Sequence, residues 1–352
     1  MVNLTAKVEQ MSSKILVPLD GSTNAEKIIV WCKGVATALG SSLLLLAVVD
    51  PDEIEREDFG PGRDRPERGA NPQDSILAGG KLSTGTVFSG PVSVASAGST
   101  SPSTFPTGTQ VIERRCEDVM KYLDGVAAEL RATGFDVSTA TAVGKPENEI
   151  LNTAEDENVE LITMATHRGS MVARGILGSV TDRVLRSATI PVMTVHPGSQ
   201  DGFGGKSGMP KVVIVPLDGS EISERAVEPA LEIADTARSE VVFVRVIRPI
   251  VDSGIEYHYY DNTDDREVSL QYLSRFAEIA DKTGLKARTH VLTGPPAVKI
   301  IEELQKYEGG LVVMSSHGSG GLTRWFVGSV ADKVIRASRR PVLVIPPDIE
   351  QE

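Results

Sequence analysis

Short apolar runs alternate with longer, more polar stretches along most of the chain. The runs are rich in Val, Ile and Leu and contain few polar residues. Strands that are buried on both faces of a parallel sheet have this composition, and the stretches between them are long enough for covering helices. The pattern therefore predicts an α/β fold with strands at residues 15–19, 43–49, 136–142, 161–165, 192–195, 212–217, 241–247, 286–292, 311–315 and 342–345.

Two sequence motifs occur twice and in the same order. Residues 16–22 (LVPLDGS) return as residues 214–220 (IVPLDGS), and residues 178–186 (GSVTDRVLR) return as residues 328–336 (GSVADKVIR). A repeat of this length indicates duplicated domains and not a solenoid of short units. The predicted organisation is a first domain at 12–196, a linker at 197–210 and a second domain at 211–347.

The two copies differ most after the second predicted strand. The N-terminal copy carries an insertion at 51–110, and 30 of its 60 residues are Gly, Pro, Ser or Thr. Such a composition cannot bury a core, so we expect poor order there, with at most a weak hairpin between 86–88 and 92–94. The Gly-rich linker is expected to be a flexible spacer.

The first helix of each copy has recognisable start and break signals. Thr23-Asn-Ala-Glu26 predicts a capping box, and the helix is expected to end before Gly40. Its counterpart starts at Ser220, and Pro229 predicts a kink in the middle of that helix.

Composition and charge exclude several classes of protein. Asp and Glu outnumber Lys and Arg by 48 to 36, for a net charge of −12, which disfavours nucleic acid as a main partner. The longest apolar run, 43–49, is too short to cross a membrane, and residues 1–13 lack a signal-peptide pattern. We therefore predict a cytoplasmic protein, with Cys32 and Cys116 as reduced packing residues.

Unusual residues gather where the first and fourth strands of each copy end. Asp20 and Asp218 follow the first strands, and in the C-terminal copy Gly318 and Gly328-Ser329 follow the fourth. Ligands of open parallel sheets bind beyond the carboxyl ends of the strands. Glycines allow close backbone approach, and free amides at a helix start bind anions. The arrangement is the outline of a phosphate site.

The PLDGS start and the Gly-x(9)-Gly-Ser-Val element resemble the universal stress protein family, over both copies. The resemblance implies two tandem open parallel sheets of five strands, each ordered 3-2-1-4-5, with helices on both faces. It also implies ATP, with or without Mg²⁺, as the ligand of a Gly-x(2)-Gly-x(9)-Gly-Ser/Thr motif, a role in the stress response, pairing of the two domains within the chain, and a homodimer.

The family motif is more complete in the C-terminal copy. It departs from the motif at Ser315, whereas the N-terminal copy departs at Ala165 and Arg168. We therefore expect the C-terminal copy to bind ATP more strongly. The matching positions are Gly318, Gly328 and Ser329 in the C-terminal copy and Gly178 and Ser179 in the N-terminal copy.

By the same resemblance, Asp218 and Val246 contact adenine or ribose, with Asp20 and Val48 as their equivalents. An Asp before Gly-Ser can also serve only to form a helix-entry turn. The further predicted nucleotide contacts are Pro18, Val180, Pro216, Met314, His317 and Val330.

The histidines and basic residues near the motif are expected to have structural and not catalytic roles. His167 and His317 are expected to make hydrogen bonds within their loops and not to act as general bases, because neither has a visible acid or cysteine partner. Solvated helix faces are expected for Arg183, Arg186, Lys333 and Arg336.

The chain lacks the Gly-x(4)-Gly-Lys-Ser/Thr motif of P-loop enzymes, and it lacks the dinucleotide fingerprint after its first strand. Three functions remain: an ATP-binding regulatory module, a slow ATPase or self-phosphorylating enzyme with Ser329 or a neighbouring hydroxyl as acceptor, and a dimerisation scaffold with degenerate sites.

Overall fold

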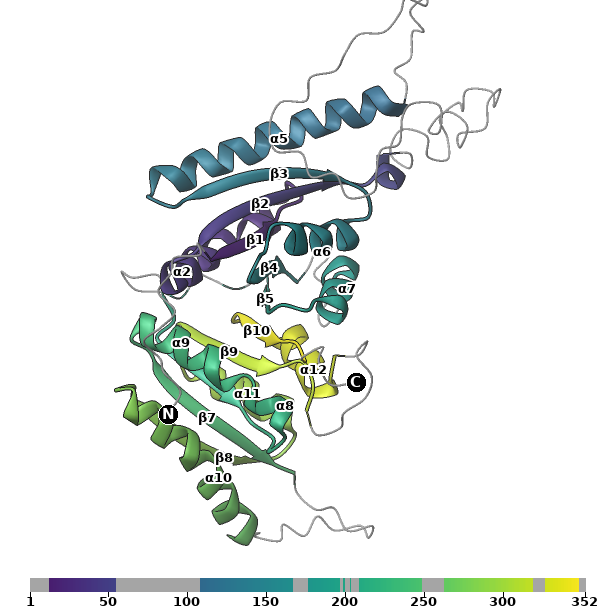
Figure 1. The fold of residues 1–352 in the computed structure, drawn as a ribbon. Coiled ribbons are helices and arrows are strands. Elements are labelled where there is room, and N and C mark those ends of the chain that lie inside the picture. The colour runs from purple at the N-terminus through teal and green to yellow at the C-terminus, as the bar shows by residue number, and fades with distance from the viewer. Residues whose placement is uncertain are drawn as a thin grey trace, which may run out of the picture.

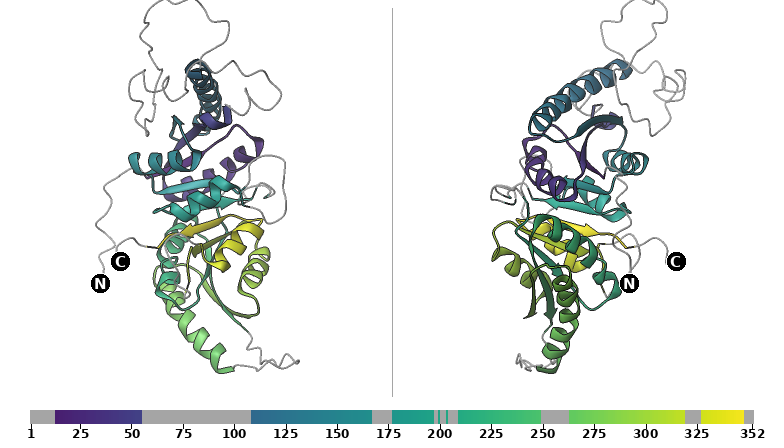
Figure 2. Two further views of the ribbon diagram at one scale, coloured as in Figure 1. Left: turned by 90° about the vertical axis from the view of Figure 1, so that its right-hand side faces the viewer. Right: turned by 60° about the vertical axis from the view of Figure 1, so that its left-hand side comes forward.

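The computed structural model describes residues 13–54, 108–166, 177–196, 199, 203, 209–248, 263–318 and 327–347. Within these residues the chain forms one ten-stranded sheet with helices on both faces (Figures 1 and 2). The strands of the N-terminal copy are β1 (Lys14–Pro18), β2 (Ser42–Val49), β3 (Val137–Val143), β4 (Leu161–Ala165) and β5 (Val192–Val195). Those of the C-terminal copy are β6 (Val212–Pro216), β7 (Glu240–Ile247), β8 (Ala287–Thr293), β9 (Gly310–Ser315) and β10 (Val342–Ile345).

The helices follow the same order in both copies. In the N-terminal copy they are α1 (Thr23–Glu26), α2 (Ile29–Leu39), α5 (Gly108–Ala132), α6 (Pro146–Asp156) and α7 (Ser179–Ser187). In the C-terminal copy they are α8 (Glu221–Glu224), α9 (Val227–Ala237), α10 (Thr263–Lys282), α11 (Pro296–Gln305) and α12 (Ser329–Ala337).

The strand order runs β3-β2-β1-β4-β5-β10-β9-β6-β7-β8. Each half therefore has the predicted order 3-2-1-4-5, and its neighbouring strands are parallel. The two predicted five-stranded sheets are joined edge to edge, because β5 and β10 pair antiparallel, with Val342 opposite Thr194 and Val344 opposite Val192. An unpaired strand edge exposes backbone donors and acceptors, and this pairing satisfies both edges at once.

Apolar cores lie on both faces of the sheet, and each contains residues of both copies. Helices α2 and α9 pack against each other across the junction. Phe203, in the predicted linker, is fully buried and meets Trp31 of α2 edge-on, with 4.8 Å between ring centroids. The linker is therefore anchored at Phe203, and its prediction as a free spacer is wrong there.

The first helix of each copy is interrupted in the same place. Ser22, not Thr23, is the first cap, since its side chain accepts a hydrogen bond from the Ala25 amide at 3.1 Å. Pro229 lies in the first turn of α9, not mid-helix, so its missing N–H breaks no helical hydrogen bond. The N-terminal copy has the same break without a proline, which means that Pro229 does not cause it.

The insertion is shorter than predicted at both ends. Residues 51–54 are helical, and α5 already begins at Gly108. The remainder, including the predicted hairpin between 86–88 and 92–94, lies outside the described residues. Among the helices that the structure describes, none is long and apolar enough to cross a membrane.

Replacing residues 55–107 with a 15-residue Gly-Ser linker should change the melting temperature by less than about 3 °C, because the segment's composition cannot bury a core. The C-terminal copy makes the same connection in the 15 residues 248–262. Removing all of 51–110 should cost more, since Asp52 pairs with Lys145 and α5 loses its first residues. Thermal denaturation compares the two deletions, and equal effects would contradict these boundaries.

Candidate nucleotide site

The site lies where the strand order reverses, between β1 and β4 and again between β6 and β9. Beyond Ile214 and Val312, no register pairs remain between β6 and β9, although both strands continue. In the N-terminal copy the pairing between β1 and β4 covers only Ile15–Leu16 and Leu161–Ile162. The loops that follow these strands therefore separate, which is where open α/β sheets form ligand crevices.

The Asp-Gly-Ser turn holds one carboxylate at each crevice. Gly219 has φ +88° and Gly21 has φ +76°, backbone conformations that favour glycine. The Oδ1 atom of Asp218 accepts hydrogen bonds from the Ser220 amide at 3.0 Å and the Ser220 hydroxyl at 2.6 Å. Asp218 thus forms the helix-entry turn with one oxygen.

The second oxygen of Asp218 faces the loop after β9. A Cβ built on Gly318 would overlap Asp218 Oδ2, so only a residue without a side chain lets the loop lie this close to the carboxylate. One oxygen of Asp218 therefore forms the turn, and the other lies against Gly318 of the loop after β9.

The loop between β9 and α12 is fixed at both ends. The Ser316 amide donates to the Ile345 carbonyl at 2.8 Å, and the Gly328 amide donates to the Ser316 carbonyl at 2.7 Å. In the N-terminal copy the Gly178 amide donates in the same way to Thr166, at 2.8 Å. The start of the last helix is thus held next to the end of the fourth strand in both copies.

Helices α7 and α12 both begin after a glycine and have no side-chain cap. By contrast, Ser22 and Ser220 cap α1 and α8 with their hydroxyls. The N-cap glycines thus offer no side-chain acceptor to the first-turn amides of α7 and α12, and a helix N-terminus favours an anion.

The backbone of Gly328 does not require glycine. Its φ of −57° and ψ of 148° are open to any residue. The constraint is spatial, because a Cβ at Gly328 would lie 3.1 Å from the Ser316 carbonyl oxygen.

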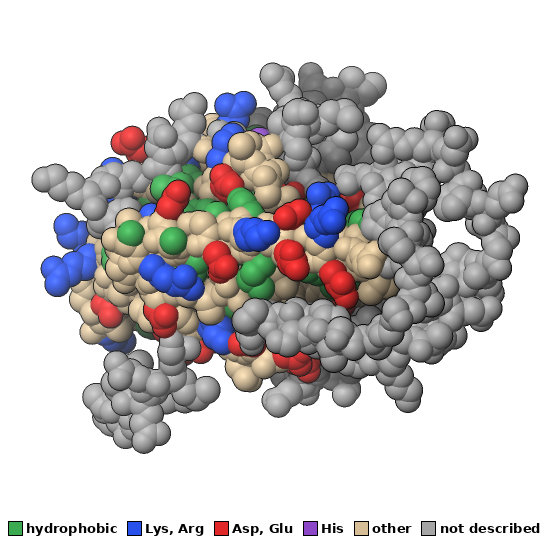
Figure 3. Space-filling view, turned by 90° about the horizontal axis from the view of Figure 1, so that it is seen from above, with side chains coloured by type: hydrophobic (Ala, Val, Ile, Leu, Met, Phe, Trp, Pro, Cys, Tyr) green, Lys and Arg blue, Asp and Glu red, His purple; other side chains and the backbone are tan. Residues whose placement is uncertain are grey.

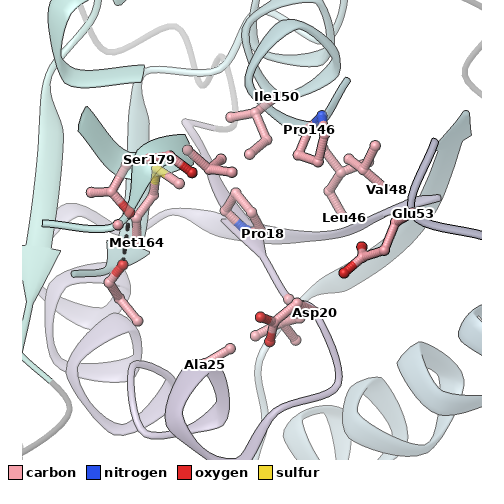
Figure 4. A pocket seen from close by; sticks show the side chains of 15 residues that line it. Pro18, Asp20, Ala25, Leu46, Val48, Glu53, Pro146, Ile150, Met164 and Ser179 are labelled. Carbon is pink, nitrogen blue, oxygen red and sulfur yellow. Dashed lines mark hydrogen bonds between the residues drawn. The ribbon is translucent and has the colours of Figure 1, made fainter. Parts of the chain in front are cut away.

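The N-terminal copy has a cavity of about 180 Å³ at this place. Figure 4 shows Ser179 and Met164 on one side, Glu53 on the opposite side and Asp20 between them. The lining residues are Pro18, Leu19, Asp20, Ala25, Leu46, Val48, Glu53, Pro146, Ile150, Met164, Ala165, Gly178, Ser179, Val180 and Thr181.

A model of the Universal stress protein family matches residues 11–196 and 209–346. The chain belongs to this family. The universal stress protein MJ0531 of Methanocaldococcus jannaschii is 33% identical over 138 residues, which cover 38% of this chain and 81% of that protein. Rv2005c of Mycobacterium tuberculosis is 29% identical over 189 residues, 53% of this chain and 61% of that protein.

Solved universal stress proteins share the fold over most of this chain. One from Archaeoglobus fulgidus superposes with a TM-score of 0.62 and 20% identity, covering 96% of this chain and 97% of that one. A second, from Pseudomonas aeruginosa and described as a putative universal stress protein, gives a TM-score of 0.56 with 16% identity and covers 96% and 94%. At these identities the likeness shows the fold.

The structure places the predicted residues of this universal stress protein in two groups. The cavity brings together Pro18, Asp20, Val48, Ala165, Gly178, Ser179 and Val180. Their C-terminal counterparts occupy the equivalent strand ends and helix start: Pro216, Asp218, Val246, Met314, Ser315, Gly318, Gly328, Ser329 and Val330. Arg168 and His167 lie outside the described residues.

Sequence reasoning missed Glu53, because the residues around it were assigned to the insertion. Residues 51–54 are held against the sheet's carboxyl end by Lys145, which pairs with Asp52 and lies 3.7 Å from Asp50. Thr181 was also missed, and its hydroxyl donates to the Ala165 carbonyl at 2.9 Å. The signal for Thr181 was its place two residues after Ser179.

Ser315, at the first glycine position of the family motif, makes its side-chain hydrogen bond within the loop after β9. Ser315 is buried, and its hydroxyl donates to the His317 carbonyl. The Ser316 hydroxyl and His317 Nδ1 share a hydrogen bond at 2.9 Å. This agrees with the prediction that His317 stabilises the loop, and it leaves Ser315 pointing inside the loop.

The prediction of solvated helix faces is wrong for two arginines. Arg186 and Arg336 form ion pairs with aspartates on their own helices, and Arg336 also reaches the other copy. Arg183 and Lys333 are exposed as predicted, and Arg183 also pairs with Glu147. The repeated Asp-x(3)-Arg spacing places both charges on one helix face, which sequence reasoning did not connect with a neighbouring helix.

Proposed function

We propose that this universal stress protein binds ATP at both crevices, more strongly in the C-terminal copy, and acts as a nucleotide-dependent regulatory module of the cytoplasmic stress response. One observation carries the proposal. In each copy a helix begins after a glycine whose amide is bonded to the end of the fourth strand. The strand-end aspartate is nearby, since Asp20 lines a cavity with Gly178 and Asp218 lies against Gly318.

The chemistry of the lining suits an adenine nucleotide. Leu46, Val48 and Ile150 provide an apolar wall for a base, and Asp20 offers a carboxylate to ribose hydroxyls or the adenine amine. The first-turn amides and the Ser179 hydroxyl would hold phosphate oxygens, with or without Mg²⁺. Gly318 supports stronger binding in the C-terminal copy, since it lets the loop approach Asp218.

The full chain should bind ATP in the micromolar range, which corresponds to about −8 kcal/mol. Isothermal titration calorimetry measures this, and the full chain is used because the cores contain residues of both copies. Asp218→Ala should remove the stronger component and Asp20→Ala the weaker one. A larger loss from Asp20→Ala would reverse the assignment of the stronger site.

The alternatives predict different spectra from purified protein. A regulatory module retains ATP in a native mass spectrum and loses it on denaturation, whereas a self-phosphorylating enzyme keeps about 80 Da of covalent phosphate after denaturation. A slow ATPase releases ADP during incubation. A scaffold with degenerate sites shows the bare chain under all conditions.

The predictions about domain pairing, a homodimer and nucleic acid rest on the strand pairing between the copies and on the charge of the described surface. The β5–β10 pairing supports association of the two domains within one chain, and a homodimer of the whole chain stays a prediction. Seen from above, acidic and basic side chains are interspersed on the described surface (Figure 3). That face shows no concentration of Lys and Arg, in keeping with the net charge of −12 that disfavours nucleic acid.

A further inference from the structure

Four charged side chains meet between α7 and α12: Asp182, Arg186, Asp332 and Arg336, here called the cross-copy network. Arg186 binds Asp182 through two nitrogens at 2.8 and 3.0 Å. Arg336 Nε binds Asp332 at 2.9 Å, and its Nη2 reaches Asp182 Oδ1 at 3.4 Å. Asp182 therefore accepts hydrogen bonds from one arginine of each copy.

The network is partly shielded from water. Between 25% and 30% of each of its side chains is exposed, so the charges are screened less than those of free surface residues. Hydrogen bonds from Arg186, with Arg336 and Arg183 nearby, hold the pKa of Asp182 below its usual range. The carboxylate is thus charged and neutralised from both sides.

Asp182 sits next to the phosphate end of the N-terminal crevice. Its amide donates to the Gly178 carbonyl at 2.9 Å, and the preceding residue, Thr181, lines the cavity. A bare carboxylate in the first turn of α7 would repel a nucleotide phosphate at the same helix end and compete for the helix dipole. The paired arginines remove this repulsion, and one of them comes from the other copy.

We propose that Arg336 of the C-terminal copy is a positioning residue for the N-terminal nucleotide site, acting through Asp182. It neutralises Asp182 and fixes that side chain away from the phosphate end of α7, so that the affinity of one copy depends on a residue of the other. This inference rests on the proposed ATP binding.

The test uses the full chain with its C-terminal site closed by Gly318→Val, so that calorimetry reports the N-terminal site. In that background Arg336→Gln should weaken ATP binding by about threefold to fivefold, the size expected for a charge at a helix end. Arg336→Lys should restore part of the loss. Lys333→Gln, the same charge change at an exposed position of the same helix, should leave the affinity unchanged.

A double-mutant cycle with Asp182→Asn distinguishes an effect of Arg336 that acts through Asp182 from a general loss of structure. In an Asp182→Asn background, Arg336→Gln should have no further effect on ATP affinity. An equal loss in both backgrounds, or no loss in either, overturns the inference while ATP binding by the parent chain still stands. A parent chain that binds no ATP at either site overturns the proposed function and this inference together.

Discussion

Gly328→Val should abolish ATP binding at the C-terminal copy while leaving the chain folded. The valine Cβ would lie 3.1 Å from the Ser316 carbonyl oxygen and 3.5 Å from His317 Cα, so the branched side chain would push the start of α12 away from the loop after β9 and disrupt the place assigned to phosphate. The strands and their packed faces are unaffected. Calorimetry should show only the weaker component of ATP binding, with a circular dichroism spectrum like that of the parent.

Gly178→Val is the matched control, since Gly178 occupies the same position before α7. It should remove the weaker component and leave the stronger one. Arg168→Gly, at a position where the N-terminal copy departs from the family motif, should strengthen that component. A folded Gly328→Val variant that binds ATP as tightly as the parent would falsify the placement of the phosphates and favour the scaffold alternative.

The second large effect concerns stability, at a charged cluster of the C-terminal copy that is centred on the buried carboxylate of Glu303. Glu303 on α11 is fully buried and contacts His290 Nδ1 at 2.8 Å and Lys306 Nζ at 2.6 Å. The Tyr307 hydroxyl donates to the same carboxylate at 3.3 Å. In the N-terminal copy the pair of Glu303 and His290 is replaced by Thr153 and Ala140.

Glu303→Thr should lower the free energy of unfolding by about 2 kcal/mol, because His290 and Lys306 lose their buried partner. The double variant His290→Ala with Glu303→Thr should recover to within about 1 kcal/mol of the parent, since it recreates the neutral pair of the other copy. Chemical denaturation measures the free energy of unfolding of both variants and of His290→Ala alone. A double variant whose loss equals the sum of the two single losses would show that Glu303 and His290 are not coupled.

The same cluster has a defined pH dependence. Burial raises the pKa of Glu303, but the hydrogen bonds from Lys306 and His290 outweigh it and leave the pKa below its usual range. A carboxylate of this kind stabilises the fold above its unfolded pKa, about 4.3, and loses the contribution as the pH falls further. The stability gap between the parent and Glu303→Thr should therefore shrink on acidification below that pH.

Most strand positions could be read from sequence because the inner strands are buried on both faces, and such runs are mainly apolar. The outer strands β3 and β8 contain more polar residues. The runs of β4, β5 and β10 match their predicted bounds, and the other strands shift by one residue at one or both ends. The doubled motif likewise located the strand-end aspartates and the helix-start glycines. Local sequence carries this information because each feature depends on neighbouring residues.

Long-range contacts were not readable in the same way. The pairing of β5 with β10 joins segments almost 150 residues apart, and nothing in either run marks it as an edge that meets the other. The burial of Phe203 among Gly-rich neighbours and the contact of Arg336 with Asp182 are likewise set by tertiary packing. Glu53 was missed because a low-complexity segment follows it directly.

The two halves that pair through β5 and β10 belong to one chain, so a substitution in one half is not repeated in the other. A homodimer carries every substitution twice, so a change that suits one side of its twofold axis must also be tolerated on the other. Here the halves are covalently joined, and each position is free to differ from its counterpart. Ala47 of β2 corresponds to Arg245 of β7, which lies over the Tyr272 ring at 4.9 Å. The two crevices of the fused chain can therefore differ in sequence, as they do where Gly318 of the C-terminal copy corresponds to Arg168 of the N-terminal copy.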